Sequence, residues 1–295
     1  MKHHFFGNPQ SQLFGVHHPP RGIAAKPPRA VLICPPIGQE YIRTHWCLRL
    51  MANQLSRSGA HVLRMDYSGM GDSAGCLQEV GSLDQWTEDI LTGIDRLKEL
   101  SGAGTVMLVG LRMGAMLAAR VAQQSNDVNS LVLWEPFGDG ESHLKELRGM
   151  HRRMLDLWVC KMTTPDDDHV EEILGSRFSR SLIESISESK NDFGSVVQPH
   201  LIVVPKHPVV NFVHIEPSVQ KVVLVEDEYN WDELRSLETA WLRSQTARKI
   251  VDLTKGMFER LNDFKALAAP ALIPAPAPVA GGSDQGTSPS TGATA

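Results

Sequence analysis

The stretch LVGLRMGAML, residues 108–117, decides the fold. The apolar run Thr105–Val109 predicts a short buried strand. It leads into the turn Gly110-Leu111-Arg112-Met113-Gly114, and the small residues of Met113–Gln123 predict a helix directly after that turn. The chain therefore passes from a buried strand into a helix within a few residues.

This strand, turn and helix match the G-x-S-x-G pattern of a nucleophile elbow, which holds a serine on a sharp turn. Arginine stands at the serine position, as Arg112. Its guanidinium stays protonated at any ordinary pH, so it cannot act as a nucleophile. The sequence thus predicts the backbone of a nucleophile elbow, with a residue at the nucleophile position that cannot act as a nucleophile.

The alternation of strand and helix continues along most of the chain. In the helix Tyr41–Arg57, we expect Trp46, Leu50 and Leu55 on the inner side. Strands that alternate with helices of this length predict βαβ crossovers and a mostly parallel sheet. Further strands are expected over Ala30–Cys34, His61–Met65, Leu131–Trp134, Leu201–Val204 and Val222–Val225, a further helix over Leu83–Leu100, and a long amphipathic segment over Trp231–Leu267.

Composition changes divide the chain into three parts. Residues 1–28 end in the proline-rich HHPPRGIAAKPP and are expected to be a lead-in of a short strand and turns. Residues 29–267 form the domain, and their charge-rich, helical segment at about 141–190 predicts a cap insertion over the sheet. Residues 268–295 are mostly Pro, Ala, Gly, Ser and Thr, and we expect disorder there because they cannot bury enough apolar surface.

Composition and charge also limit the partners. The formal net charge of −5 gives no reason to expect nucleic acid. Four scattered cysteines without a C-x-x-C pair favour a reduced, cytoplasmic protein. The start MKHHFFGNPQ lacks the apolar core of a signal peptide, and no apolar run is long enough to predict a membrane span. We expect neither a metal nor another cofactor.

Three motifs in order resemble the α/β-hydrolase superfamily over residues 29 to about 265. They are CPPIG (34–38) at the oxyanion loop, DYSGMGDS (66–73) after the next strand, and GLRMGA (110–115) at the elbow. More narrowly, CPPIGQEY, LRMDYSGMGDS and G-L-R-x-G-A resemble the exosortase A system-associated hydrolases, whose relatives occur beside natural-product and polysaccharide pathways. The resemblance implies an α/β-hydrolase fold, with a mostly parallel, doubly wound sheet of about eight strands and a helical cap.

The resemblance also implies a catalytic triad, of which two positions are vacant. A serine hydrolase of this superfamily needs a nucleophile, an acid and a histidine, in that chain order. Arg112 occupies the nucleophile position, and no histidine follows His214. The acid position offers Glu216, after His207 and His214, or Glu135 at the end of the preceding strand.

The oxyanion hole is expected to survive. The resemblance places its two backbone donors at Ile37, beside Gly38, and at Met113, and neither donor is proline. These N–H groups, a helix N-terminus and the Arg112 guanidinium would form an electropositive pocket suited to a carboxylate or phosphate.

A structural ion pair is the alternative for Arg112. Glu135, Glu40 and Glu226 are candidate partners, because an unpaired buried charge would cost several kcal/mol. Cys34 is a weak candidate for a substitute nucleophile, since a buried structural cysteine is the commoner case and the sequence names no base beside it.

Three functions stay open on these residues. The chain could bind or process an acyl or carboxylate-bearing molecule in a biosynthetic pathway, without serine hydrolysis. It could be an active hydrolase or acyltransferase for an ester, thioester or peptide, with a noncanonical residue set. It could also be a non-catalytic scaffold for a carrier protein or an assembly enzyme. An open, positive elbow pocket favours the first function, and a pocket filled by side chains favours the third.

Overall fold

The computed structural model describes residues 1–157, 168–205, 220–225 and 244–268. Its main sheet has the order β1-β2-β4-β3-β5-β6-β9-β10. All neighbours from β4 to β10 run parallel, while β1 and β2 are antiparallel, which confirms the mostly parallel sheet. The strands are β1 (Lys2–Asn8), β2 (Ser11–His18), β3 (Arg29–Cys34), β4 (Ala60–Met65), β5 (Val106–Leu111), β6 (Val128–Trp134), β9 (His200–Pro205) and β10 (Gln220–Val225).

Helices cover both faces of this sheet. α1 (Gly38–Arg57) and α7 (Ser244–Ala268) pack on one face, and α2 (Leu83–Ser101) and α3 (Met113–Gln124) pack on the other. Alternate side chains of β3 enter opposite cores, as Val31 on the α1 side and Leu32 on the α2 side show. The central strands are therefore buried on both faces, which explains their continuous apolar runs.

α1 begins earlier than expected, at Gly38, and presents a different face to the sheet. Its buried apolar residues are Cys47, Leu48, Met51, Ala52 and Leu55, which follow the i, i+3, i+4 spacing of an amphipathic helix. Leu55 is buried as predicted, but the predictions for Trp46 and Leu50 were wrong, because they are 51% and 38% exposed. They belong to a second apolar row of the helix, and only one row can face the sheet.

Residues 1–28 contain more structure than the expected lead-in. β1 and β2 form a hairpin, with Lys2 paired to His17 and Asn8 to Ser11. β2 then pairs with β4, so the hairpin extends the main sheet. Phe6 and Leu13 face the core from this hairpin, and their burial accounts for its attachment.

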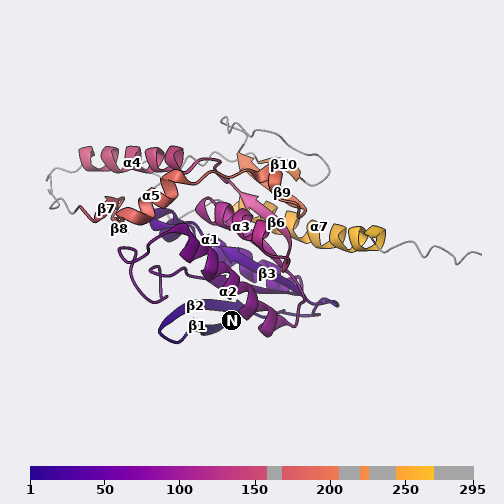
Figure 1. The fold of residues 1–295 in the computed structure, drawn as a ribbon. Coiled ribbons are helices and arrows are strands. Elements are labelled where there is room, and N and C mark those ends of the chain that lie inside the picture. The colour runs from indigo at the N-terminus through magenta and orange to yellow at the C-terminus, as the bar shows by residue number, and fades with distance from the viewer. Residues whose placement is uncertain (158–167, 206–219, 226–243, 269–295) are drawn as a thin grey trace, which may run out of the picture.

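The segment between β6 and β9 forms the cap. It consists of α4 (Gly140–Leu157), β7 (Val170–Ile173), β8 (Ser176–Ser179), α5 (Arg180–Glu188) and the short helix η1 (Phe193–Ser195). Figure 1 shows α4, α5 and the β7–β8 hairpin above the upper left end of the sheet, with α7 at the right. The hairpin adds a β element to the expected helical cap. Residues 269–295 of the expected tail lie outside the described residues.

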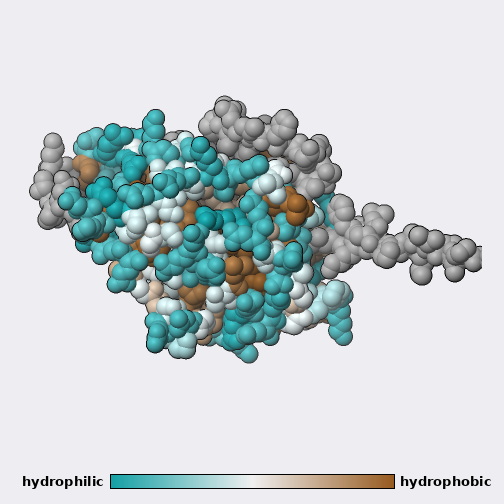
Figure 2. All heavy atoms as spheres, viewed as in Figure 1, coloured by the Kyte–Doolittle hydropathy of each residue, from teal (hydrophilic) through white to brown (hydrophobic). Residues whose placement is uncertain are grey.

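The described surface on the face drawn in Figure 2 is mostly hydrophilic, and its hydrophobic residues form small separate patches. None of the described helices combines the length and apolarity that a bilayer crossing requires.

Two buried histidines lie at the end of β2. Burial and the neighbouring His61 lower the pKa of His17 to about 4, and its Nε2 lies 3.2 Å from His61 Nδ1. Burial and the neighbouring Arg64 also lower the pKa of His18 to about 4, although the hydrogen bond with Asn53 opposes the shift. Both rings are therefore neutral in the folded protein under conditions in which an unfolded histidine, of pKa near 6.5, gains a proton.

We predict that acid destabilises this sheet edge. Because the unfolded chain binds more protons than the folded one, the free energy of unfolding should fall as the pH drops from about 6.5 toward 4, by up to about 3 kcal/mol per histidine. Urea unfolding across this range would measure the slope. His17→Gln with His18→Gln should make this slope shallower, whereas His3→Gln, on the exposed side of β1, should not. An unchanged slope in the double variant would contradict the assignment.

Candidate functional site

The turn between β5 and α3 has the geometry of an elbow. Arg112 stands between them with φ 54° and ψ −116°, a region that non-glycine residues rarely occupy and that costs about 1–3 kcal/mol. Glycines on both sides make the turn possible. A Cβ at Gly110 would overlap the backbone of Gly114 and Ala115, and a Cβ at Gly114 would overlap the Cys34 carbonyl. Close packing of strand and helix therefore holds the turn.

The Arg112 side chain is buried in a network of the protein's own groups. Its Nε donates to Glu40 Oε1 at 3.0 Å, and its Nη2 donates to Glu146 Oε1 at 3.0 Å. The same Nη2 lies 3.4 Å from His143 Nδ1. The guanidinium carbon lies 5.9 Å from the centre of the Phe137 ring. Only 8% of Arg112 remains exposed, so the protein itself fills the space around the guanidinium.

The partners of Arg112 come from separate parts of the chain. Glu40 lies in the first turn of α1, directly after the CPPIG loop, and is almost completely buried. Glu146 and His143 lie on the cap helix α4, where the Glu146 side chain is 31% exposed. Sequence reasoning missed both cap residues because they belong to an insertion without a motif. Only the i, i+3 spacing of His143 and Glu146 on one helix would have grouped them.

The charges of the network compensate one another. Burial opposes the positive charge of Arg112, but Glu40 and Glu146 outweigh it and raise the pKa of Arg112 further. Burial raises the pKa of Glu40, and the adjacent guanidinium opposes that rise. Burial and Arg112 lower the pKa of His143 well below its usual value, so this ring is neutral at physiological pH. The site therefore holds a paired cation instead of the electropositive pocket expected from the sequence.

The structure distinguishes between the candidate ion-pair partners of Arg112 that the sequence left open. Glu40 is in direct contact with Arg112. Glu135 follows β6 with a strained φ of 45°, and its backbone N–H donates to the Val203 carbonyl at 2.8 Å. Its charge also raises the pKa of Arg112. Glu226 lies outside the described residues, as do His207, His214 and Glu216.

The proposed oxyanion residues stand at two adjacent helix starts. Ile37 is the N-cap of α1, and Met113 is the first residue of α3; both are buried. Gly38 has a left-handed φ of 55°, and the atoms nearest to an added Cβ would be those of Phe178 and Ser176 in the cap hairpin. The cap thus covers this loop, and the role of these residues as oxyanion donors stays a prediction.

Cys34 occupies a poor position for a nucleophile. It ends β3, is completely buried, and burial raises the pKa of its thiol far above the usual value. The reactive thiolate is therefore disfavoured.

Ser68 and Ser73 stabilise the turn after β4. Ser68 donates its hydroxyl to Asp89 at 3.0 Å, and Ser73 donates its hydroxyl to the Asp66 carbonyl at 2.7 Å. Within the described residues, no group of three or more potential metal ligands is arranged to hold an ion.

A comparison with known protein families shows to which family this chain belongs. Residues 26–277 match the model of the family described as serine aminopeptidase, S33. The chain belongs to this family. Lysophosphatidylserine lipase ABHD12 of Xenopus tropicalis is 36% identical over 87 residues, which are 28% of this chain and 22% of the lipase. The chain therefore shares only a minor part of that relative's length.

Solved structures share the fold over most of their length. Est1E of Butyrivibrio proteoclasticus, with ferulic acid bound, has a TM-score of 0.58 at 16% identity, covering 87% of this chain and 99% of Est1E. Mouse alpha/beta hydrolase domain-containing protein 10 has a TM-score of 0.53 at 16% identity, covering 87% of this chain and 100% of the mouse protein. DcsB, in complex with its substrate analogue, has a TM-score of 0.57 at 14% identity, over 89% and 98%. The α/β-hydrolase fold is confirmed.

We predict that Arg112→Ala lowers the free energy of unfolding by about 3–5 kcal/mol, because it leaves the buried Glu40 and its neighbour Glu146 without their cation. Urea unfolding at neutral pH would measure the loss. Arg120→Ala is the matched control, since it removes from α3 a guanidinium that pairs with the exposed Asp84 of α2. Its effect should be about 0–1 kcal/mol. Equal losses in the two variants would mean that the Arg112 network contributes no more than a surface pair.

Proposed function

We propose that this chain is a non-hydrolytic member of the serine aminopeptidase S33 family, which acts by binding a protein partner. The observation that carries this proposal is the state of the elbow. Arg112 stands where the fold presents its nucleophile, and Glu40 and Glu146 both bind its guanidinium. A turn of this kind offers neither a nucleophilic oxygen nor an open anion site.

The two other functions fit these residues less well. Serine hydrolysis needs a base beside a nucleophile, and the described histidine nearest to the elbow, His143, faces a guanidinium through Nδ1. No histidine follows His214 in the sequence. An acyl carboxylate at the elbow would have to displace Glu40 or Glu146 from Arg112, so the expected affinity for such a ligand is low.

The exposed face of α1 supports a protein partner. Ile42, Trp46 and Leu50 form one row at i, i+4 and i+8, and they are 63%, 51% and 38% exposed. The Arg49 guanidinium lies 5.2 Å from the Trp46 ring centre and keeps this aromatic side chain on the surface. Such rows of apolar side chains on one helix mark interaction sites when they remain uncovered.

The charge of this row indicates the kind of partner. The only acid of α1 is Glu40, which is buried against Arg112. Arg49 and Arg57 therefore give the outer face of α1 a positive charge without a carboxylate of its own. A helix with apolar and acidic side chains would complement it. The resemblance of CPPIGQEY and G-L-R-x-G-A to the exosortase A system-associated hydrolases supports a carrier protein or assembly enzyme of a biosynthetic pathway as that partner.

The absence of hydrolysis is tested with a fluorophosphonate probe. Intact-protein mass spectrometry should find no covalent adduct on the wild-type protein, and p-nitrophenyl esters should not be turned over above background. Arg112→Ser should stay unreactive too, because a serine without a histidine base remains a weak nucleophile. A serine hydrolase of the same fold, treated in parallel, is the positive control. A stoichiometric adduct on the wild-type protein would overturn the proposal, and Cys34→Ala would then show whether this thiol is responsible.

The proposed partner-binding row of α1, Ile42, Trp46 and Leu50, is tested with a purified, isotope-labelled acyl carrier protein from the same organism. We expect its NMR signals along one acidic helix to shift or broaden when the wild-type chain is added. Trp46→Ala should weaken this binding, and Arg49→Glu should abolish it because it places a like charge against the partner. Lys145→Gln, at an exposed position of the cap, is the control for net charge. Equal binding by all variants would place the contact elsewhere, and no binding would exclude this carrier class.

A further inference from the structure

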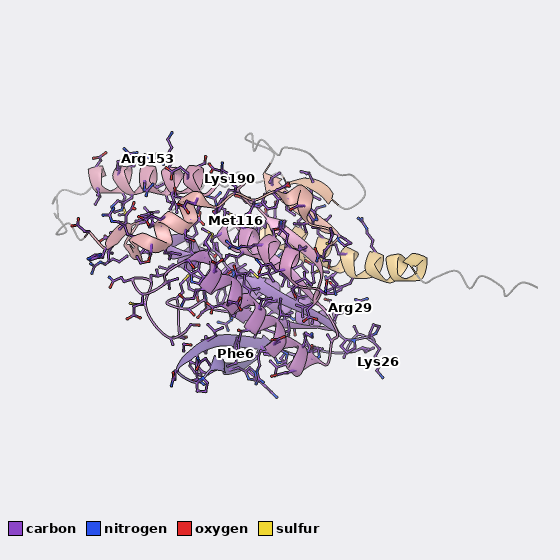
Figure 3. The ribbon with its side chains drawn as sticks, in the orientation of Figure 1. Phe6, Lys26, Arg29, Met116, Arg153 and Lys190 are labelled. Carbon is purple, nitrogen blue, oxygen red and sulfur yellow. The ribbon has the colours of Figure 1, made fainter. Side chains whose placement is uncertain are left out.

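A concave site lies at the opposite end of the sheet from the elbow. A cavity of about 310 Å³ opens where β3, β5 and β6 begin. Figure 3 shows Lys26 and Arg29 at this end of the molecule, far from the cap residues Arg153 and Lys190. The cavity shares no lining residue with the Arg112 network or with the exposed row of α1.

The polar side chains of this cavity are donors. Lys26 and Arg29 supply two cations, and none of the lining residues that the structure describes is acidic. The Arg29 guanidinium lies 5.2 Å from the centre of the Phe258 ring, which holds it in place. A cation that is already positioned loses less conformational entropy when an anion binds to it.

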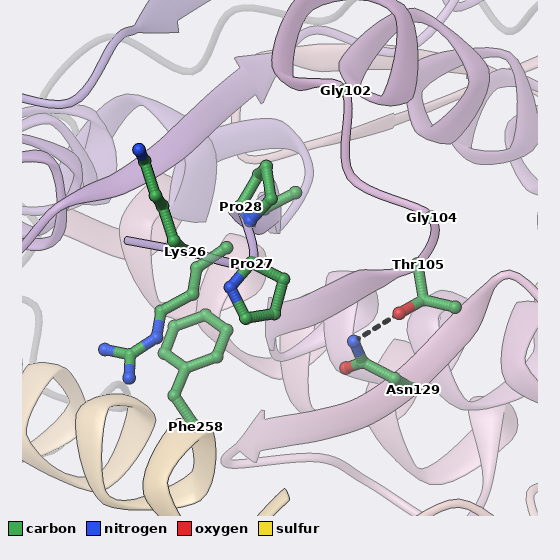
Figure 4. A pocket seen from close by; sticks show the side chains of 10 residues that line it. Lys26, Pro27, Pro28, Gly102, Gly104, Thr105, Asn129 and Phe258 are labelled. Carbon is green, nitrogen blue, oxygen red and sulfur yellow. Dashed lines mark hydrogen bonds between the residues drawn. The ribbon is translucent and has the colours of Figure 1, made fainter. Parts of the chain in front are cut away.

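Two neutral side chains add directed donors. Asn129 Nδ2 donates to Thr105 Oγ1 at 2.8 Å, and Asn129 Oδ1 accepts from Ser130 at 2.7 Å, so the orientation of the amide is fixed. Since Thr105 Oγ1 accepts this bond, its own proton remains available to a ligand. Figure 4 shows the Pro27 ring between Phe258 and the Thr105–Asn129 pair.

The C-terminus of α2 disfavours the binding of an anion in this cavity. α2 ends at Gly102, on the rim of the cavity, and a helix C-terminus carries negative partial charge. The left-handed Gly102 directs its N–H to the Lys98 carbonyl at 2.8 Å, which satisfies part of that terminus. Two full positive charges exceed the remaining half charge of the helix end.

The walls of the cavity are flat and apolar. Pro27, Pro28 and the Phe258 ring face it beside the donors. We propose that this cavity binds a small organic anion, in which a carboxylate or phosphate is attached to a flat apolar body. The charged end would lie against Lys26 and Arg29, and the body would lie against the proline and phenylalanine rings. The volume is at the lower end of the range typical of ligand pockets, so it fits one ring and one acid group.

The test is a calorimetric or NMR titration of the full chain with phenyl phosphate and with benzoate, which distinguish the two acid groups. Inorganic phosphate supplies the charge without the body, and benzyl alcohol supplies the body without the charge. We expect saturable binding of phenyl phosphate or benzoate, and much weaker binding of both controls. Lys26→Gln and Arg29→Gln should each weaken it about tenfold, since each removes a charge-assisted hydrogen bond. Added salt should weaken it as well.

Lys145→Gln is again the control, because it removes one exposed cation from the cap and should leave the affinity unchanged. Lys26 is itself exposed, so its variant keeps the test valid even where Arg29→Gln disturbs folding. The proposal is wrong when neither acid binds saturably up to about 10 mM, a limit of weak specific binding. It is also wrong when Lys26→Gln and Lys145→Gln behave alike. Either result leaves the proposal for the elbow untouched, since the fluorophosphonate test does not involve this cavity.

Discussion

The buried ion pair between Arg112 and Glu40 is the interaction on which the rest of the site depends. A charge in this position must be paired, because its desolvation would otherwise cost several kcal/mol. Glu40 supplies the pairing from α1, and Glu146 supplies it from the cap helix α4. One guanidinium thus connects the elbow, the helix after the CPPIG loop and the cap. These three parts of the chain meet around the Arg112 side chain.

The strained turn at Arg112 is held by packing. Its conformation follows from packing, since Gly110 and Gly114 bring β5 and α3 closer to each other and to the Cys34 carbonyl than any larger residue allows. Arg112, in the turn between these glycines, takes a rarely populated backbone conformation that this packing holds in place. The fold therefore fixes where the side chain at position 112 points, and the identity of that residue alone decides between chemistry and an ion pair. The backbone of the elbow therefore does not depend on which side chain stands at position 112.

The sequence predicts the parts of this structure that depend on local pattern. Apolar runs located the central strands, and the glycines located the elbow, because burial on two faces and close approach both restrict residue type directly. A short strand was expected within residues 1–28, but its pairing into the β1–β2 hairpin and the attachment of β2 to β4 were missed, because no local pattern specifies which strands pair. The face of α1 was assigned wrongly because the helix carries two apolar rows. Glu146 was missed because its partner is distant in sequence, and only the fold brings the cap over the elbow.

The pairing of Arg112 also determines the outer surface of α1. Glu40 is the only carboxylate of that helix, and the ion pair turns it inward. The outer face of α1 therefore carries Arg49 and Arg57 beside the exposed row Ile42, Trp46 and Leu50. No carboxylate of α1 neutralises these two arginines. A glutamate on that face would form i, i+4 pairs with these arginines and reduce their attraction for an external acid. Glu40 thus neutralises Arg112, and its burial also leaves the outer face of α1 positively charged. The pairing of Arg112 and the proposed recognition of an acidic partner both depend on Glu40.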